Sequence, residues 1–177
     1  MFTIEIDDDL SIELINKALA PTYLQLVQQN YDYLDQWLTW PSVCKAVEDF
    51  EEYINSVLHK YAEGEAIVCA MRYKGDVVGN VALFEIESRL KRAKIGYWLI
   101  ESAQGNGVVN RSVRYLIDHA FTNLGIKKIQ IHAAQGNTPS RAVAEKLGFK
   151  LEGIITRNEI IGDRIIDHAV YGLTEAD

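Results

Sequence analysis

The segment YWLIESAQGNGVVNRSVRYLIDHAF runs from Tyr97 to Phe121 and joins two different patterns. An apolar, strand-like run stops at Gln-Gly-Asn-Gly, and apolar residues then recur at helical spacing. Glycines directly before a helix let an anion approach the backbone N–H groups at the positive end of the helix dipole. The junction can therefore hold a phosphate or pyrophosphate without a lysine, although a glycine pair alone also suits a tight strand-to-helix turn.

On both sides of this segment, the order of the patterns predicts an α/β protein. Strands are expected over 2–6, 12–14, 66–73, 77–84, 94–100, 129–131, 149–155 and 165–173, and helices over 21–33, 50–61, 113–124 and 138–148. Thr138 is the expected N-cap of the last helix, with Pro139 at its first position. The strand–helix–strand crossover places two adjacent parallel strands in a mixed sheet. We expect one domain over residues 1–177.

Composition narrows the class of protein. The chain has 177 residues, a formal net charge of −7 and 48% hydrophobic residues, which argues against nucleic-acid binding and is compatible with an amine substrate. The start MFTIEIDDDL is unlike a signal peptide, and no apolar run is long enough to cross a bilayer. We expect a cytoplasmic protein with no membrane partner. Cys44 and Cys69 are unpatterned, and no spacing among the histidines suggests a metal site.

Two other phosphate-binding motifs fit the junction poorly. A dinucleotide-binding fingerprint needs a third small residue where GNGVVN has Asn110, and the segment lies mid-chain. A P-loop needs Gly-Lys-Ser/Thr, which does not follow. A nucleotide-binding domain that uses the same glycine turn stays a minor alternative.

Several motifs, in order, resemble one family. Gln104-Gly105-Asn106-Gly107-Val108-Val109 is similar to the Q/R-x-x-G-x-G/A pyrophosphate loop of GNAT acetyltransferases. KRAKIGYWLIESAQGNG, GNTPSRAVAEKLGFKLEG and LDQWLTW resemble the RimJ/RimL branch, which contains ribosomal-protein N-terminal acetyltransferases. The resemblance implies a GNAT-like fold, with a mixed central sheet flanked by helices. Two splayed parallel strands in that sheet would form a cleft for acetyl-CoA.

The resemblance also assigns a donor site. The pyrophosphate would lie on the backbone amides of the loop, formed by Gln104, Gly105, Asn106, Gly107, Val108, Val109 and Asn110. Leu99 and Ile100 would pair their backbone with the pantetheine arm, and an N–H there would polarise the thioester carbonyl. Asn137 matches the asparagine that contacts pantetheine, and it also suits a turn. Val109 stands where glycine or alanine is usual, which narrows the approach of the phosphate.

Direct acetyl transfer needs a neutral amine, a stabilised oxyanion and a proton for the departing thiolate. Many GNAT enzymes carry a tyrosine acid before the Glu-Lys-Leu-Gly-Phe segment, where this chain has Ala144. Ser140 fills the Asn-x-x-Ser position of the branch and could donate that proton, although capping explains it equally well. Lys94 replaces a frequent acidic residue. Glu159, expected just before the last hairpin, matches a glutamate near the acceptor amine and is the preferred base.

The acceptor side is expected to come from the N-terminal part and from one strand. Trp37 and Trp40 supply aromatic walls, with one expected buried and the other lining the cleft. Glu85 and Glu87 are expected to flank the same cleft. The four histidines are expected to be structural or exposed, and the neighbours Asp167 and His168 should point to opposite faces of a strand.

These observations favour an acetyl-CoA-dependent N-acetyltransferase acting on a primary amine. A protein N-terminal amine, such as that of a ribosomal protein, is preferred by analogy with the branch. The alternatives are an acetyltransferase for a small amine of the polyamine or aminoglycoside type, and a non-catalytic acyl-CoA-binding protein. The resemblance is also compatible with a homodimer.

Overall fold

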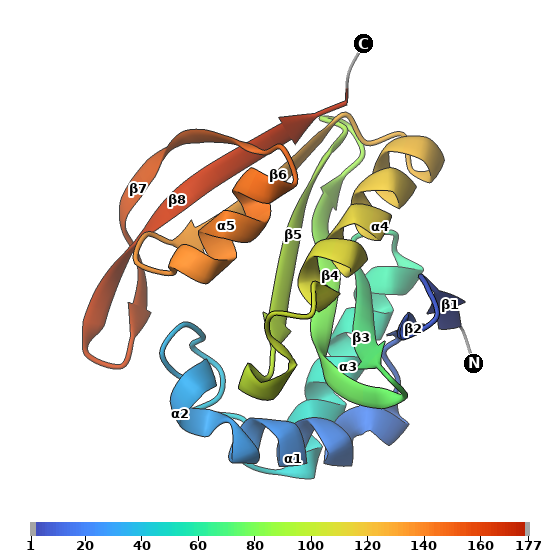
Figure 1. Cartoon of the computed structure of the whole chain (residues 1–177), viewed down its shortest axis with the longest axis vertical. Helices are drawn as coiled ribbons and strands as arrows, with labels where there is room; N and C mark the ends of the chain where they lie inside the picture. The colour runs from blue at the N-terminus through green and yellow to red at the C-terminus, as the bar shows by residue number, and fades with distance from the viewer. Residues whose placement is uncertain (1–2, 176–177) are drawn as a thin grey trace.

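The computed structural model describes residues 3–175, which form one mixed sheet with helices on both faces (Figure 1). Its strands are β1 (Thr3–Glu5), β2 (Leu10–Leu14), β3 (Ile67–Tyr73), β4 (Asp76–Glu87), β5 (Arg92–Leu99), β6 (Lys128–Ala134), β7 (Lys150–Ile161) and β8 (Arg164–Thr174), in the spatial order β1-β2-β3-β4-β5-β6-β8-β7. The α-helices are α1 (Ala20–Gln29), α2 (Tyr31–Leu34), α3 (Val47–Ala62), α4 (Val108–Asn123) and α5 (Thr138–Lys146). The predicted α/β class is confirmed.

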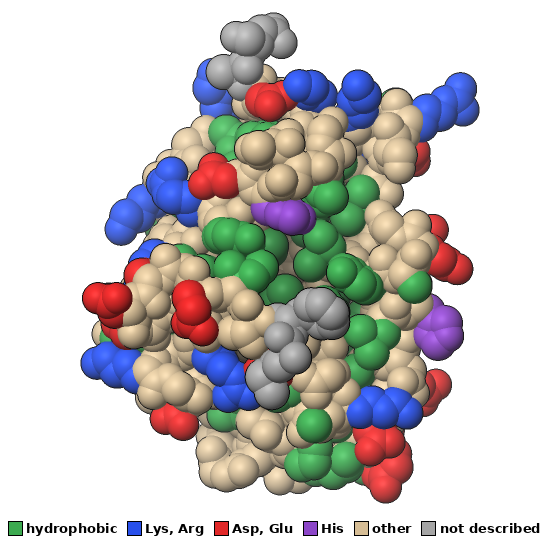
Figure 2. Space-filling view, turned by 90° about the vertical axis from the view of Figure 1, so that its right-hand side faces the viewer, with side chains coloured by type: hydrophobic (Ala, Val, Ile, Leu, Met, Phe, Trp, Pro, Cys, Tyr) green, Lys and Arg blue, Asp and Glu red, His purple; other side chains and the backbone are tan. Residues whose placement is uncertain are grey.

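Strand alternation divides the core into two layers. In β3, Cys69 and Met71 pack on the α4 side, while Val68 and Ala70 pack on the side of α1 and α3. Because successive side chains of a strand point to opposite faces, one strand can serve both layers. On the face that carries α4 and the N-terminal strands, apolar side chains gather near the middle, with charged side chains of both signs around them (Figure 2).

The central feature of the sheet is the divergence of β5 from β6. The two strands are parallel, and their register covers only Arg92↔Lys128, Ala93↔Ile129 and Lys94↔Gln130. Beyond Lys94, β5 pairs only with β4, and β6 continues beside β8. The expected pair of splayed parallel strands is confirmed, and the splay leaves one edge of β5 unpaired.

Several predicted boundaries change. The helix expected over 21–33 is interrupted at Asn30, which has φ −119° and ψ 22°, so that α1 and α2 are separate. The N-cap of α5 is Asn137, whose side chain accepts a hydrogen bond from the N–H of Ser140; the expected cap, Thr138, is the first helical residue. Residue 2 of the first expected strand lies outside the described residues.

The last hairpin is longer than predicted. The strand continues through the polar residues after Ile155, which form a bulge between Ile155 and Glu159. Pairing with β8 resumes at Glu159. Glu159 therefore lies inside β7, opposite Ile166 of β8, and does not precede the hairpin as expected.

Candidate active site

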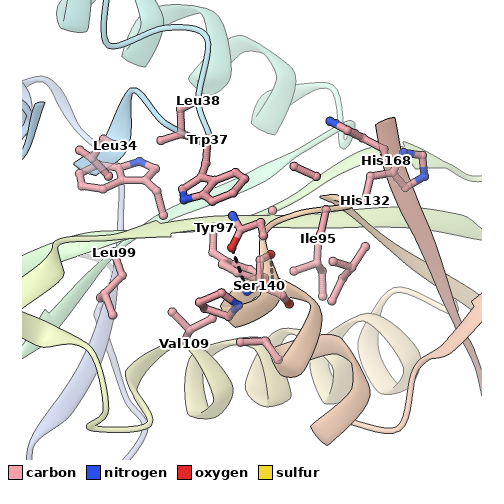
Figure 3. A pocket seen from close by; sticks show the side chains of 18 of the residues that line it. Leu34, Trp37, Leu38, Ile95, Tyr97, Leu99, Val109, His132, Ser140 and His168 are labelled. Atoms are coloured by element: carbon pink, nitrogen blue, oxygen red, sulfur yellow. Dashed lines mark hydrogen bonds between the residues drawn. The ribbon is translucent and has the colours of Figure 1, made fainter. Parts of the chain in front are cut away.

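A cavity of about 760 Å³ opens where β5 and β6 diverge. The loop before α4, the start of α5, the β7–β8 hairpin and the segment after α2 complete its walls. Figure 3 shows Trp37 and Leu38 on one side of this space, with Tyr97, Ser140 and Val109 on the other. The cavity thus joins segments from the two halves of the chain.

The glycine junction forms the end of the cavity at α4. Gly105 and Gly107 have φ of +76° and +69°, and Gly107 is the N-cap of α4 without a side-chain cap. The first N–H groups of a helix have no intrahelical acceptor. The amides of Val108, Val109 and Asn110 are therefore available to a ligand, at the positive end of the helix dipole.

Most of the loop residues predicted from the sequence line this cavity: Gln104, Gly105, Gly107, Val108, Val109 and Asn110. Asn106 does not, because its side chain folds back and donates hydrogen bonds to the carbonyl oxygens of Ala103 (3.2 Å) and Gln104 (3.0 Å). The Asn106 side chain thus stabilises the turn instead of facing the cavity.

Arg111 links the loop before α4 to the acidic turn between β1 and β2. Its guanidinium lies 2.6 Å from a carboxylate oxygen of Asp7 and of Asp9, and it donates a hydrogen bond to the carbonyl oxygen of Asn106 at 3.0 Å. The hydrogen bond from Arg111 holds the pKa of Asp7 below its ordinary value. The acidic turn between β1 and β2 therefore fixes the loop through this arginine.

The unpaired edge of β5 follows from strand alternation. The N–H of Ile100 donates to the carbonyl of Val78 at 2.9 Å, so the backbone of Ile100 faces β4. In a strand, alternate residues direct their backbone groups to opposite edges. The backbone groups of Leu99 and Tyr97 therefore face the gap toward β6, and those of Ile95 face β6 where the paired part of the two strands ends. The prediction for Ile100 is wrong, since its N–H is already bonded and it lines a second hollow of about 440 Å³.

Ser140 and Tyr97 form a hydrogen-bonded pair at the start of α5. The Tyr97 hydroxyl lies 3.0 Å from the Ser140 carbonyl oxygen and 3.1 Å from its Oγ. A phenol has one proton, which the carbonyl must accept, so the Ser140 hydroxyl donates to the Tyr97 oxygen. Burial raises the pKa of Tyr97 to about 12, and its phenol stays neutral. Asn137 lines the cavity beside this pair while it caps α5.

Glu159 and Glu85 line the cavity, and each has a basic partner. Glu159 Oε2 lies 3.1 Å from His168 Nε2, and Glu85 Oε2 lies 2.6 Å from Lys94 Nζ. Glu87 lies outside the lining, at the exposed end of β4, so the expectation that it flanks the cleft is wrong.

Both predicted tryptophans line the cavity, and neither is fully buried. Trp40 packs against Phe50 and Trp98, with ring centroids 6.2 and 5.7 Å apart. Trp37 reaches across toward Gly136, where an added Cβ would lie 3.8 Å from its ring. The expected division into one buried and one lining tryptophan is therefore wrong, because the segment between α2 and α3 exposes both rings to the same space.

The lining also includes side chains that were not selected from the sequence, among them Tyr97, His132 and His168. Tyr97 lies in the strand that leads to the glycine loop, so its position was a usable signal. His132 was expected to be structural or exposed, yet its buried Nε2 has no hydrogen-bond partner within residues 3–175. Burial, followed by the nearby Lys94, lowers the pKa of His132.

Within the described part of the chain, no group of three or more His, Cys, Asp or Glu side chains could hold a metal ion. Across the same residues, no helix has the length and apolar character needed to cross a membrane.

Comparison with known proteins places this geometry among acetyltransferases. The profile described as "Acetyltransferase (GNAT) domain" matches residues 10–150. The chain is 31% identical to the putative ribosomal N-acetyltransferase YdaF of Bacillus subtilis, over 86% of this chain and 84% of the relative. It is 28% identical to the ribosomal-protein-serine acetyltransferase of Escherichia coli, over 96% and 94% of the two chains. RimL, a ribosomal alpha-N-protein acetyltransferase solved with coenzyme A, superposes with a TM-score of 0.93 at 27% identity, covering 97% of each chain.

Proposed function

This chain belongs to the GNAT acetyltransferase family, and from that premise we propose that it transfers acetyl from acetyl-CoA directly to a primary amine. The preferred acceptor is a protein N-terminal amine, of the kind carried by a ribosomal protein. The names of the two relatives and of RimL support this acceptor. The proposal rests on a single observation: the start of α4, where the first N–H groups have no intrahelical acceptor, and the edge of β5 that is not paired with β6 lie in the same cavity.

The donor fits the residues that are present. The amides at the start of α4 would hold the pyrophosphate, and the positive φ of Gly105 and Gly107 keeps that approach open. The free backbone edge of Leu99 and Tyr97, which lies beyond the last β5–β6 pair at Lys94↔Gln130, would hold the pantetheine arm by hydrogen bonds like those of a sheet. When bound, acetyl-CoA supplies the activated acetyl thioester.

The chain's own groups then serve the transfer. A backbone N–H on the free edge of β5 stabilises the oxyanion, a kind of contact whose loss costs about 100-fold or more in rate. The Ser140 hydroxyl can turn from Tyr97 to protonate the leaving thiolate and then regain a proton from solvent, while the proton taken up by Glu159 is released to solvent. Glu159 takes the proton from the amine nitrogen as general base. No covalent intermediate on the enzyme is needed.

The charges of the cavity favour a single amine over a polycation. Its lining carboxylates are Glu85, which is paired with Lys94, and Glu159, which is hydrogen-bonded to His168. Several uncompensated carboxylates would favour a polyamine or an aminoglycoside, and among the described residues of this lining only Glu159 has no lysine or arginine partner. A protein N-terminus presents one amine, followed by a peptide that the tryptophan walls can contact. A ribosomal acceptor would place the reaction in the cytoplasm.

An acceptor panel tests the proposal. Thiol release from acetyl-CoA is followed with N-terminal peptides of ribosomal proteins, spermidine and an aminoglycoside, and mass spectrometry locates the acetyl group. We expect release with the peptides and none with the same peptides blocked at the N-terminus. Faster release with spermidine would favour the small-amine alternative. Calorimetric binding of acetyl-CoA without release for any acceptor would favour a non-catalytic acyl-CoA-binding protein.

A further inference from the structure

We propose that His168 is a positioning residue for acetyl transfer. Its Nε2–H holds the Glu159 carboxylate in place, and the side chain of Asn158 fixes the imidazole in the tautomer that can do so. The inference rests on the proposed function, in which Glu159 is the base, and it adds two residues that the sequence did not single out for catalysis.

The bulge in β7 brings the three side chains together. Ile155 is opposite His168 and Glu159 is opposite Ile166, so three residues of β7 face one residue of β8. Arg157, within the bulge, has φ +55°, and its N–H donates to Asp167 Oδ1 at 2.8 Å.

In a regular strand, consecutive side chains point to opposite faces. Here, Asn158 and Glu159 both reach the same imidazole because the bulge redirects one of them. Asp167 on the neighbouring strand holds the bulge in this conformation. The arrangement is therefore a product of the irregular hairpin.

The hydrogen bonds define the tautomer. The Asn158 Nδ2 group lies 3.1 Å from His168 Nδ1, and an amide nitrogen can only donate. With the amide in this orientation Nδ1 accepts, and a neutral ring then carries its proton on Nε2. That nitrogen lies 3.1 Å from Glu159 Oε2, to which it donates.

The consequence is a carboxylate held in a fixed position. The His168 side chain is 13% exposed and that of Glu159 33%, so the bond between them is partly buried. One carboxylate oxygen accepts from the imidazole, which leaves the other for the amine. In the reaction the N–C bond forms, the C–S bond breaks and the amine proton moves to Glu159, while His168 keeps its own proton.

Nitrogen-15 NMR of the histidine-labelled chain tests the tautomer without any acceptor. We expect protonated Nε2 and unprotonated Nδ1 at His168 near neutral pH, with the signal assigned by its loss in His168→Gln. In Asn158→Asp the carboxylate must accept from Nδ1, so we expect that nitrogen to become protonated. A proton on Nδ1 in the unaltered chain would overturn the proposal and leave acetyl transfer itself unaffected.

Kinetics test the role. His168→Phe should lower kcat about 10- to 100-fold, a part of the effect expected for loss of a general base. The KM for acetyl-CoA should stay unchanged, because the donor amides lie at α4. His168→Gln keeps an N–H donor and should restore kcat to within a few-fold. Equal kcat values for His168→Phe and His168→Gln would overturn the proposal. Absence of transfer by the unaltered chain would overturn the proposed function, and with it the role of the pair, while the NMR result would still stand.

Discussion

Replacing Gly107 with alanine distinguishes the contribution of the loop to stability from its contribution to coenzyme A binding. Gly107 is the N-cap of α4 at φ +69°, and an added Cβ would meet only Arg111 Nε, at 3.9 Å. The protein has room for the methyl group, so the backbone conformation sets the cost. Gly125 at the other end of the same helix has φ +64° with nothing within 4 Å of an added Cβ. Gly125→Ala is therefore the matched control.

Both substitutions place an L-residue in the left-handed region, which costs about 1 to 2 kcal/mol. At about 2 to 4 °C per kcal/mol for a domain of this size, the two variants should lose similar amounts of thermal stability. Only Gly107→Ala tilts amides that face the cavity. A hydrogen bond to a charged group contributes about 1.5 to 3 kcal/mol. Misdirecting one amide should therefore weaken coenzyme A binding about 10- to 100-fold.

Calorimetry with coenzyme A, beside thermal unfolding of the same samples, measures both quantities. We expect a similar fall in Tm for the two variants and a fall in affinity for Gly107→Ala alone. Unchanged affinity in folded Gly107→Ala, or an equal loss in Gly125→Ala, would refute the assignment of the pyrophosphate to these amides.

Three further predictions follow from the site. Ser140→Ala should lower kcat with little change in KM for acetyl-CoA, which steady-state kinetics would measure; an unchanged kcat would exclude the hydroxyl as the acid. Arg111→Ala removes the hydrogen bond to the carbonyl oxygen of Asn106 and should raise the KM for acetyl-CoA, with kcat retained at saturation. An unaltered KM would show that Arg111 is not needed to hold the loop for acetyl-CoA. Burial and Lys94 lower the pKa of His132 in the fold, so the folded chain takes up this proton at a lower pH than the unfolded chain, whose ordinary value is 6.5. Stability should therefore be lost as pH falls below about 6.5, and urea unfolding should find this loss reduced in His132→Gln.

The order of the elements and the glycine junction could be predicted because both depend on local pattern. Periodicity indicated β5 and α4, and the position of Gly107 between them indicated the helix start that lines the cavity. Asn137, which was selected through its motif, lines the cavity and caps α5, although the cap was predicted one residue late, at Thr138. These features need only neighbouring residues, which a sequence displays directly.

The rest of the site depends on contacts between distant segments. The Tyr97–Ser140 pair joins β5 to α5. The Glu159–His168 pair needs a bulge whose length no alternation pattern reveals. The role expected for Ile100 is wrong for a similar reason, since the edge that a backbone N–H faces depends on the register with β4.

The most direct measurement is a crystal structure of the chain with coenzyme A. We expect the diphosphate on the amides that begin α4, within residues 106–110, and the pantetheine arm along β5 from Leu99 toward Ile95. Coenzyme A bound in another hollow, or a helix start covered by protein in the complex, would contradict the account.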